Sequence, residues 1–215
     1  MKKLITLTLA ATLLACGASA AQEEPESCKP KIAGSALALA DEIEDAQLQC
    51  DLDKAAQIAD ESERLFNIYF RPAIRIVDTA TPSGAAYVYD IVDSNDQLTL
   101  DVRRVPITPD ARVGSCRLRT TLDDTVGQNI AAYTGKIMAA RPAAYGKREE
   151  VIINADGSRQ VKLLLDAQDI VTTIETDSGE FAYSRHTRST GPVNDLNELI
   201  IGVANASNGW QCNPV

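Results

Sequence analysis

The sequence contains a single histidine, His186, which is the first candidate for acid–base chemistry. A histidine-centred triad needs a nucleophile within hydrogen-bond reach, and the chain has no G-x-S-x-G turn that would supply a serine. We therefore expect His186 to be a solvated residue at the end of a strand, and the sequence identifies no catalytic residue.

Zinc and copper sites need several imidazole or thiolate ligands. The five cysteines are Cys16, Cys28, Cys50, Cys116 and Cys212, and no two of them form a C-x-x-C pair. We expect the last four to form two structural disulfides, as is typical of an oxidising compartment. One histidine and oxidised cysteines leave too few ligands, so we expect no metal and no cofactor.

Carboxylates are abundant, with 30 Asp and Glu residues in the chain. Two facing carboxyl groups can hydrolyse glycosides when they lie roughly 5–5.5 Å or 6.5–9.5 Å apart. Because so many acids make some pair inevitable, the spacing singles out none. A carboxylate-dependent hydrolase acting on envelope polymer is the alternative functional hypothesis.

Basic side chains gather in one stretch of this acidic chain: Arg103, Arg104, Arg112, Arg117 and Arg119. On an exposed strand face they would form a dock for an acidic partner surface. The alternative is an ordinary solvated face balanced by Asp101. These arginines are the candidate partner-binding patch.

The N-terminus has the three parts of an export signal. Lys2 and Lys3 precede an apolar segment, residues 4–14, and small residues follow at 15–20. The apolar segment is shorter than the roughly 20 residues that span a bilayer. A cleaved signal peptide over residues 1–20 is the interpretation, and it places the mature chain in the cell envelope.

The signal can end in two ways. Ala18-Ser19-Ala20 is an A-x-A cleavage site that would release a soluble periplasmic protein. Leu13-Leu14-Ala15-Cys16-Gly17 resembles the lipobox of bacterial lipoproteins, which implies a lipid on Cys16 and an outer-membrane anchor. Residues 16–30 are small, acidic and proline-containing, as expected of a flexible tether.

The net charge of the chain is −9. Binding to a phosphate backbone needs clustered Lys and Arg, so nucleic acid is an unfavourable partner. Anionic headgroups are disfavoured for the same reason, which leaves the N-terminal lipid as the only expected membrane contact.

Two helices are predicted before Pro72. Apolar residues recur every three or four positions over 31–49, and Cys50-Asp51-Leu52-Asp53 has the character of a break whose aspartates cap a second helix. We therefore predict an N-terminal helical hairpin. The aromatic residues Phe66, Tyr69 and Phe70 near its end are expected in the core.

This hairpin constrains the disulfides. A helix over 31–49 would be about 28 Å long. It would hold Cys28 and Cys50 much farther apart than the ~7 Å that a disulfide allows between Cα atoms. We predict Cys28–Cys212 with Cys50–Cys116, or the crossed pairs Cys28–Cys116 and Cys50–Cys212.

After Pro72 the apolar residues alternate and turn residues punctuate the chain. The predicted strands are 73–79, 85–93, 97–105, 113–122, 148–154, 159–166, 169–176 and 180–186. Helices are predicted over 125–140 and from a capping box at Asp195 to about residue 206. Pairing Val105 with Val113 places Asp101 opposite Arg117 and turns Cys116 toward the core.

The fold class expected is α+β, a helical hairpin followed by antiparallel sheet or sheets in a ββββα–ββββα order. Residues 31–215 form a single α+β domain or two lobes, 31–142 and 147–215. With no nucleophile, metal or phosphate motif, we expect a non-enzymatic binding or interaction module for a protein or a small molecule, and a structural stabiliser of an envelope complex is a third hypothesis.

Overall fold

The computed structural model describes residues 28, 39–79, 84–94, 97–108, 113–146, 149–153, 156–163 and 169–213. Their elements, in chain order, are α1 (Leu39–Phe66), β1 (Ile74–Asp78), β2 (Ala85–Ser94), β3 (Gln97–Pro106), β4 (Cys116–Thr121), α2 (Asp124–Ala140), β5 (Glu149–Ile153), β6 (Arg159–Leu163), β7 (Asp169–Thr176), β8 (Gly179–His186), α3 (Pro192–Ala206) and β9 (Gln211–Cys212).

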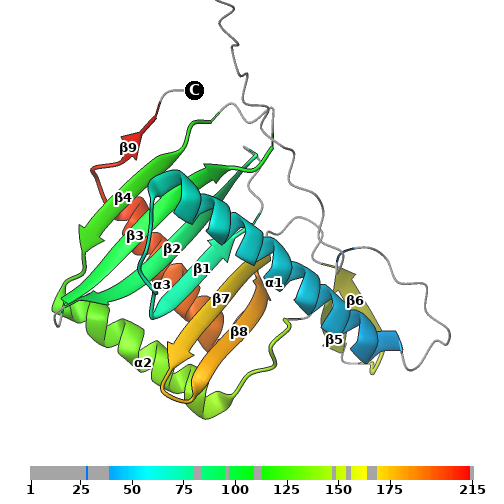
Figure 1. Ribbon diagram of the computed structural model, residues 1–215. Coiled ribbons are helices and arrows are strands. Elements are labelled where there is room, and N and C mark those ends of the chain that lie inside the picture. The colour runs from blue at the N-terminus through cyan, green and yellow to red at the C-terminus, as the bar shows by residue number, and fades with distance from the viewer. Residues whose placement is uncertain are drawn as a thin grey trace, which may run out of the picture.

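Seven strands form one antiparallel sheet in the order β8-β7-β1-β2-β3-β4-β9 (Figure 1). Strands β5 and β6 form a separate two-stranded sheet. Because β7 pairs with β1, strands from both predicted ββββα segments share the large sheet. The α+β class and the antiparallel sheet are confirmed.

The predicted helical hairpin is wrong, because α1 is one uninterrupted helix of 28 residues. No glycine or proline occurs between its ends to break it. Inside the helix Asp51 and Asp53 accept hydrogen bonds from Gln47 and Gln49, each 2.8 Å long. The aspartates that resembled caps are therefore partners in i, i+4 pairs.

Helices cover both faces of the sheet (Figure 1). On one face α1 packs Ala55 and Ile58 onto Val77, Val88 and their neighbours. On the other face, α2 and α3 cover the larger core, which contains the following residues from strands and helices: Ile74, Ile76, Tyr89, Ile91, Leu100, Val102, Leu118, Ile130, Ile137, Leu196 and Ile200.

The sheet therefore has an α1 face and an α2–α3 face. Alternation along each strand sends odd and even residues to different helices.

Two disulfides join Cys28 to Cys50 and Cys116 to Cys212. Both predicted pairings are wrong. The helix begins at Leu39 rather than near residue 31, so Cys28 is not separated from Cys50 by a full helical rod, and their Cα atoms lie 4.7 Å apart. Cys116 meets Cys212 because β9 pairs with β4.

The β3–β4 register differs from the prediction by two residues. Asp101 lies opposite Arg119, and Arg103 lies opposite Arg117. A shift of two residues preserves the faces, so Cys116 still faces the α2–α3 side, where it is buried. The expected contact of Asp101 with Arg117 forms as a diagonal ion pair, 2.5 Å long.

The start of α3 also differs from the predicted capping box. The helix begins at Pro192 after Gly191, which has a φ of 118° and makes no side-chain cap. Proline suits the first helical position because its missing N–H has no intrahelical acceptor there.

Two disulfides indicate an oxidising, extracytoplasmic compartment. None of the helices in the described part of the chain has the length and apolar character needed to cross a bilayer.

Candidate functional site

A row of charged residues crosses the α1 face of the sheet. The strand pairings place Arg75 of β1 opposite Asp90 of β2, Asp90 opposite Asp101 of β3, and Asp101 opposite Arg119 of β4. The two aspartates are fully buried. A buried carboxylate is costly unless opposite charges and hydrogen bonds compensate it, so the partners of this row decide whether it is stable.

Each buried aspartate lies between two arginines. Asp90 accepts hydrogen bonds from Arg75, at 2.7 Å from Nε, and from Arg103. Asp101 accepts from Arg117 at 2.5 Å, and its Oδ1 lies 3.6 Å from Nε of Arg103. Arg75 also donates to Glu63 of α1 at 2.6 Å. We call these six residues, Glu63, Arg75, Asp90, Asp101, Arg103 and Arg117, the ionic network; it holds three positive and three negative side chains.

The environment shifts the pKa values of Arg75 and Arg103 in opposite directions. Burial by itself lowers the pKa of Arg75, but the hydrogen bonds and charges of Asp90 and Glu63 outweigh it and raise that pKa above its ordinary value. For Arg103 burial dominates and lowers the pKa, against the opposing charges of Asp90 and Asp101. Nε and Nη1 of Arg103 have no hydrogen-bond partner among the described residues.

The ring of Phe70 covers Arg103, whose guanidinium carbon lies 5.9 Å from the ring centroid. Phe70 belongs to the segment that links α1 to β1. This contact joins the ionic network to the surface of the molecule, where the same segment lines a groove.

The groove lies at the C-terminal end of α1 and has a volume of about 420 Å³. Its lining comes from α1, the α1–β1 segment and the β7–β8 hairpin, and consists of Glu63, Tyr69, Phe70, Arg71, Pro72, Arg75, Thr173, Glu175 and Glu180. We call it the α1–hairpin groove. Arg71 and Glu175 form an ion pair across it at 2.8 Å.

Two groups in this groove are available to a ligand. The side chain of Tyr69 is 92 % exposed, the highest value among the exposed large hydrophobic residues of the described chain. Glu180 is exposed and has no ion pair with any described residue. The prediction that Tyr69 lies in the core is therefore wrong: the helix ends at Phe66, and Tyr69 follows as an exposed residue between the buried Ile68 and the partly buried Phe70.

The five arginines of the predicted patch do not share one surface. Arg103 is 0 % exposed and cannot meet a partner. Arg104 points to the opposite face, where it donates to the carbonyl of Gly114 at 3.0 Å. Arg117 is partly exposed and paired with Asp101.

The other two patch residues differ in how far the structure describes them. Arg119 is exposed and lines a polar hollow of about 420 Å³ beside the β2–β3 turn. Arg112 lies outside the described residues, as does Cys16.

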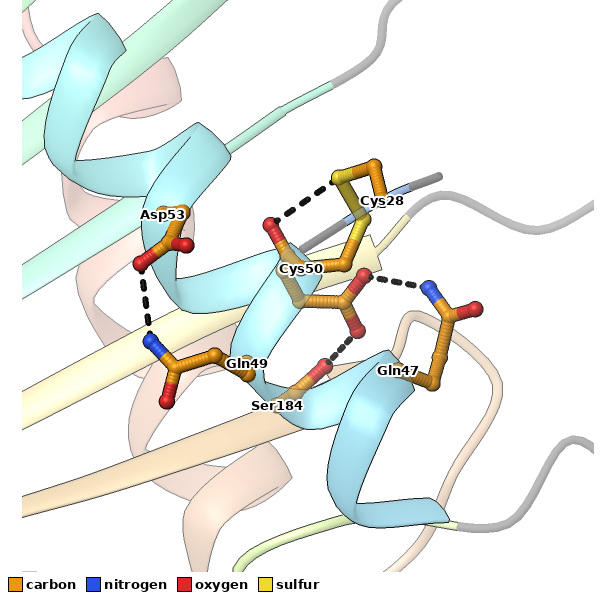
Figure 2. Close-up of a disulfide and its surroundings, with 7 residues drawn as sticks. Cys28, Gln47, Gln49, Cys50, Asp53 and Ser184 are labelled. Atoms are coloured by element: carbon orange, nitrogen blue, oxygen red, sulfur yellow. Dashed lines mark hydrogen bonds between the residues drawn. A yellow bond between two sulfur atoms is a disulfide. The ribbon is translucent and has the colours of Figure 1, made fainter. Parts of the chain in front are cut away.

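His186 is only 2 % exposed, so the expectation of a solvated side chain is wrong. It lies at the end of β8 on the α1 face, two residues beyond Ser184. The hydroxyl of Ser184 donates to the carboxylate of Asp51 at 2.6 Å, beneath the Cys28–Cys50 disulfide (Figure 2). This buried hydrogen bond fixes the first half of α1 to β8.

Comparisons of the chain with protein-family models, with curated proteins and with solved structures found no match. The candidate function therefore rests on the residues of the site.

Proposed function

We propose that this chain is a non-enzymatic binding module of the bacterial cell envelope, and that the α1–hairpin groove receives a lysine or arginine side chain from a partner protein. The observation that carries the proposal is the combination of an exposed tyrosine ring and an unpaired carboxylate in one groove. An aromatic face and a carboxylate are both attractive to an ammonium or guanidinium group.

The charge balance supports a cationic partner. The ionic network is neutral, and Arg71 neutralises Glu175, which leaves Glu180 as the excess charge of the groove. The whole chain has a net charge of −9, which would steer basic surfaces toward it.

The alternative hypothesis, a carboxylate-dependent hydrolase, receives less support. Two pairs of carboxylates lie directly opposite each other in the described part of the sheet, Asp90 with Asp101 and Glu175 with Glu180. Asp90 and Asp101 are buried beneath α1 and Phe70 with arginines on either side, so a glycosidic substrate has no access to them. In the second pair Glu175 is held in an ion pair by Arg71, which leaves Glu180 as the single unpaired acid.

The N-terminus of the mature protein is part of this proposal. A lipid on Cys16 would hold the module at the outer membrane, whereas cleavage after Ala20 would release it into the periplasm. The intact mass of the protein purified from membranes distinguishes the two ends.

The groove is tested with the peptide acetyl-Gly-Arg-Gly-amide titrated into the full mature protein and followed by NMR chemical shifts. We expect weak binding that is further weakened by salt, because the groove is open to solvent. Tyr69→Ala and Glu180→Gln should each reduce affinity about two- to fivefold, from roughly 0.5–1 kcal/mol per contact.

Matched variants keep this test specific. Tyr69→Phe retains the aromatic face and should bind like the wild type, and Asp195→Asn removes an exposed carboxylate from α3 on the opposite side of the sheet. The peptide acetyl-Gly-Glu-Gly-amide carries the opposite charge and should bind more weakly. Equal binding of this glutamate peptide, or unchanged affinity in Tyr69→Ala and Glu180→Gln, would contradict the proposal.

A further inference from the structure

A second cavity, of about 250 Å³, lies against α3 on the other face of the sheet. One side of α3 and the ends of β7 and β8 line it, and the residues that matter here are Ile170, Asn194, Asn197, Ile201 and Gly202. We call it the α3 pocket. It shares no lining residue with the α1–hairpin groove.

Asn194 leaves a hydrogen-bond acceptor unused in the wall of this pocket. The residue is 3 % exposed, and its Nδ2 donates to the backbone carbonyl of His186 at 2.9 Å. That bond fixes the orientation of the amide, because the reverse orientation would place two oxygens against each other. Oδ1 of Asn194 has no hydrogen-bond partner among the described residues.

Asn197, one turn later, is also a buried amide with one unpaired polar atom. It is 1 % exposed, and its Oδ1 accepts from the hydroxyl of Thr172 at 2.8 Å, while Nδ2 has no partner among the described residues. A hydroxyl can donate or accept, so either orientation of this amide leaves one polar atom unpaired. Unpaired buried polar atoms destabilise a fold, and two of them in one cavity wall call for an explanation.

Gly202 lies at the edge of the pocket. It lies inside α3, where glycine is less favourable than alanine, and it is exposed. A Cβ built there would meet no atom within 4 Å. The packing of the helix does not require glycine at this position, and because Gly202 is exposed and lines the pocket, a larger side chain there would narrow the pocket entrance.

We propose that the α3 pocket binds a small neutral molecule that carries an amide next to an apolar group, such as an N-acyl amino-acid amide. The ligand N–H donates to Oδ1 of Asn194, and the ligand carbonyl oxygen accepts from Nδ2 of Asn197. Ile170 and Ile201 provide the apolar wall. The volume equals that of about eight water molecules at roughly 30 Å³ each, which suits a ligand of this size.

The two unpaired atoms are shielded from solvent, so the proposed binding requires the pocket wall to open slightly.

The test uses N-acetyl-leucinamide titrated into the full mature protein, followed by NMR chemical shifts. We expect saturable shifts centred on α3 and the ends of β7 and β8. Methyl 2-acetoxy-4-methylpentanoate has a similar shape, but ester oxygens replace both amide nitrogens, so it has no N–H to donate to Asn194 and should bind at least fivefold more weakly. Equal affinity for the ester, or no saturable shifts from the amide, would overturn the proposal.

Two glycine variants complete the test. Gly202→Leu should fold with an unchanged or higher melting temperature, yet bind N-acetyl-leucinamide at least tenfold more weakly. Gly135→Leu is the matched control, because Gly135 is exposed within α2 and a Cβ there also meets nothing within 4 Å. Unchanged binding by Gly202→Leu, or equal losses in both variants, would refute the site. Because the groove lies on the other face, its peptide binding should survive in Gly202→Leu, so the two proposals fail independently.

Discussion

Replacing Arg103 by methionine tests whether the ionic network stabilises the fold. The substitution keeps an unbranched apolar side chain of similar length and removes the guanidinium. It deletes the hydrogen bond to Asp90, the contact with Asp101 and the stacking on Phe70. Both aspartates stay buried, each with one arginine fewer.

The expected loss in the free energy of unfolding depends on the ion pairs that remain in Arg103→Met. Removing one partner of a buried ion pair typically costs about 3–5 kcal/mol, because the other charge is left uncompensated. Here Asp90 keeps Arg75 at 2.7 Å, and Asp101 keeps Arg117 at 2.5 Å. Methionine also avoids the cost of burying a charge. We therefore expect the low end of the range, about 3 kcal/mol in the free energy of unfolding.

The measurement is urea unfolding followed by circular dichroism and by the fluorescence of Trp210. Arg119→Met is the matched control, since Arg119 lies on the same face of the sheet but is exposed. Its loss should stay within about 0.5 kcal/mol. Adding Asp90→Asn to Arg103→Met restores the charge balance and should cost less than the sum of the two single changes. If Arg103→Met is as stable as Arg119→Met, the network does not stabilise the protein and the reasoning is refuted.

Two further predictions concern the disulfides and alkaline pH. The Cys116–Cys212 bond joins residues 96 apart and the Cys28–Cys50 bond residues 22 apart, so chain entropy predicts losses of about 4.7 and 3.4 kcal/mol when each pair is changed to alanine. A larger loss from the shorter ring in urea unfolding would contradict this order. Burial, with the charges of Asp78 and Tyr87, raises the pKa of Tyr89 well above its ordinary value near 10. The unfolded tyrosine ionises first, so this contribution to stability is complete below about pH 10 and declines above it. Between pH 9 and pH 11 the free energy of unfolding should decline less in Tyr89→Phe than in the wild type. Tyr69→Phe changes an exposed ring and should decline like the wild type. Equal declines in the wild type and Tyr89→Phe would contradict this role of Tyr89.

Local sequence patterns were sufficient to predict most strands and α2, but they did not predict α1 as one helix. Period-two alternation and turn residues locate the strand edges within a few positions, for example at β2 and β7. The sequence around Asp51 favours a helix break, whereas the carboxylate is satisfied by Ser184, 133 residues away. No local pattern contains that partner. The wrong disulfide pairing has a separate cause. The first helix was predicted to begin near residue 31, whereas α1 begins at Leu39.

The candidate site was predicted less well for a related reason. Charged residues are usually exposed, so Asp101 and Arg103 suggested a solvated face. They are buried because α1 and Phe70 cover that face, which is a property of the packing and not of the strand. The near-continuous apolar character of β2 is the one local signal of burial on both faces. The groove itself combines α1 with β7 and β8, segments more than 100 residues apart.

The Cys28–Cys50 bond also determines how the protein would carry a mechanical load. A pull on the chain before Cys28 passes through the disulfide directly into Cys50, and the residues between the two cysteines form a ring that bears no tension. The load enters α1 beside the Asp51–Ser184 hydrogen bond, in the interior of the helix rather than at its first turn. A tether attached upstream would therefore drag α1 and β8 together as one body, and the first turns of the helix would not be peeled from the sheet.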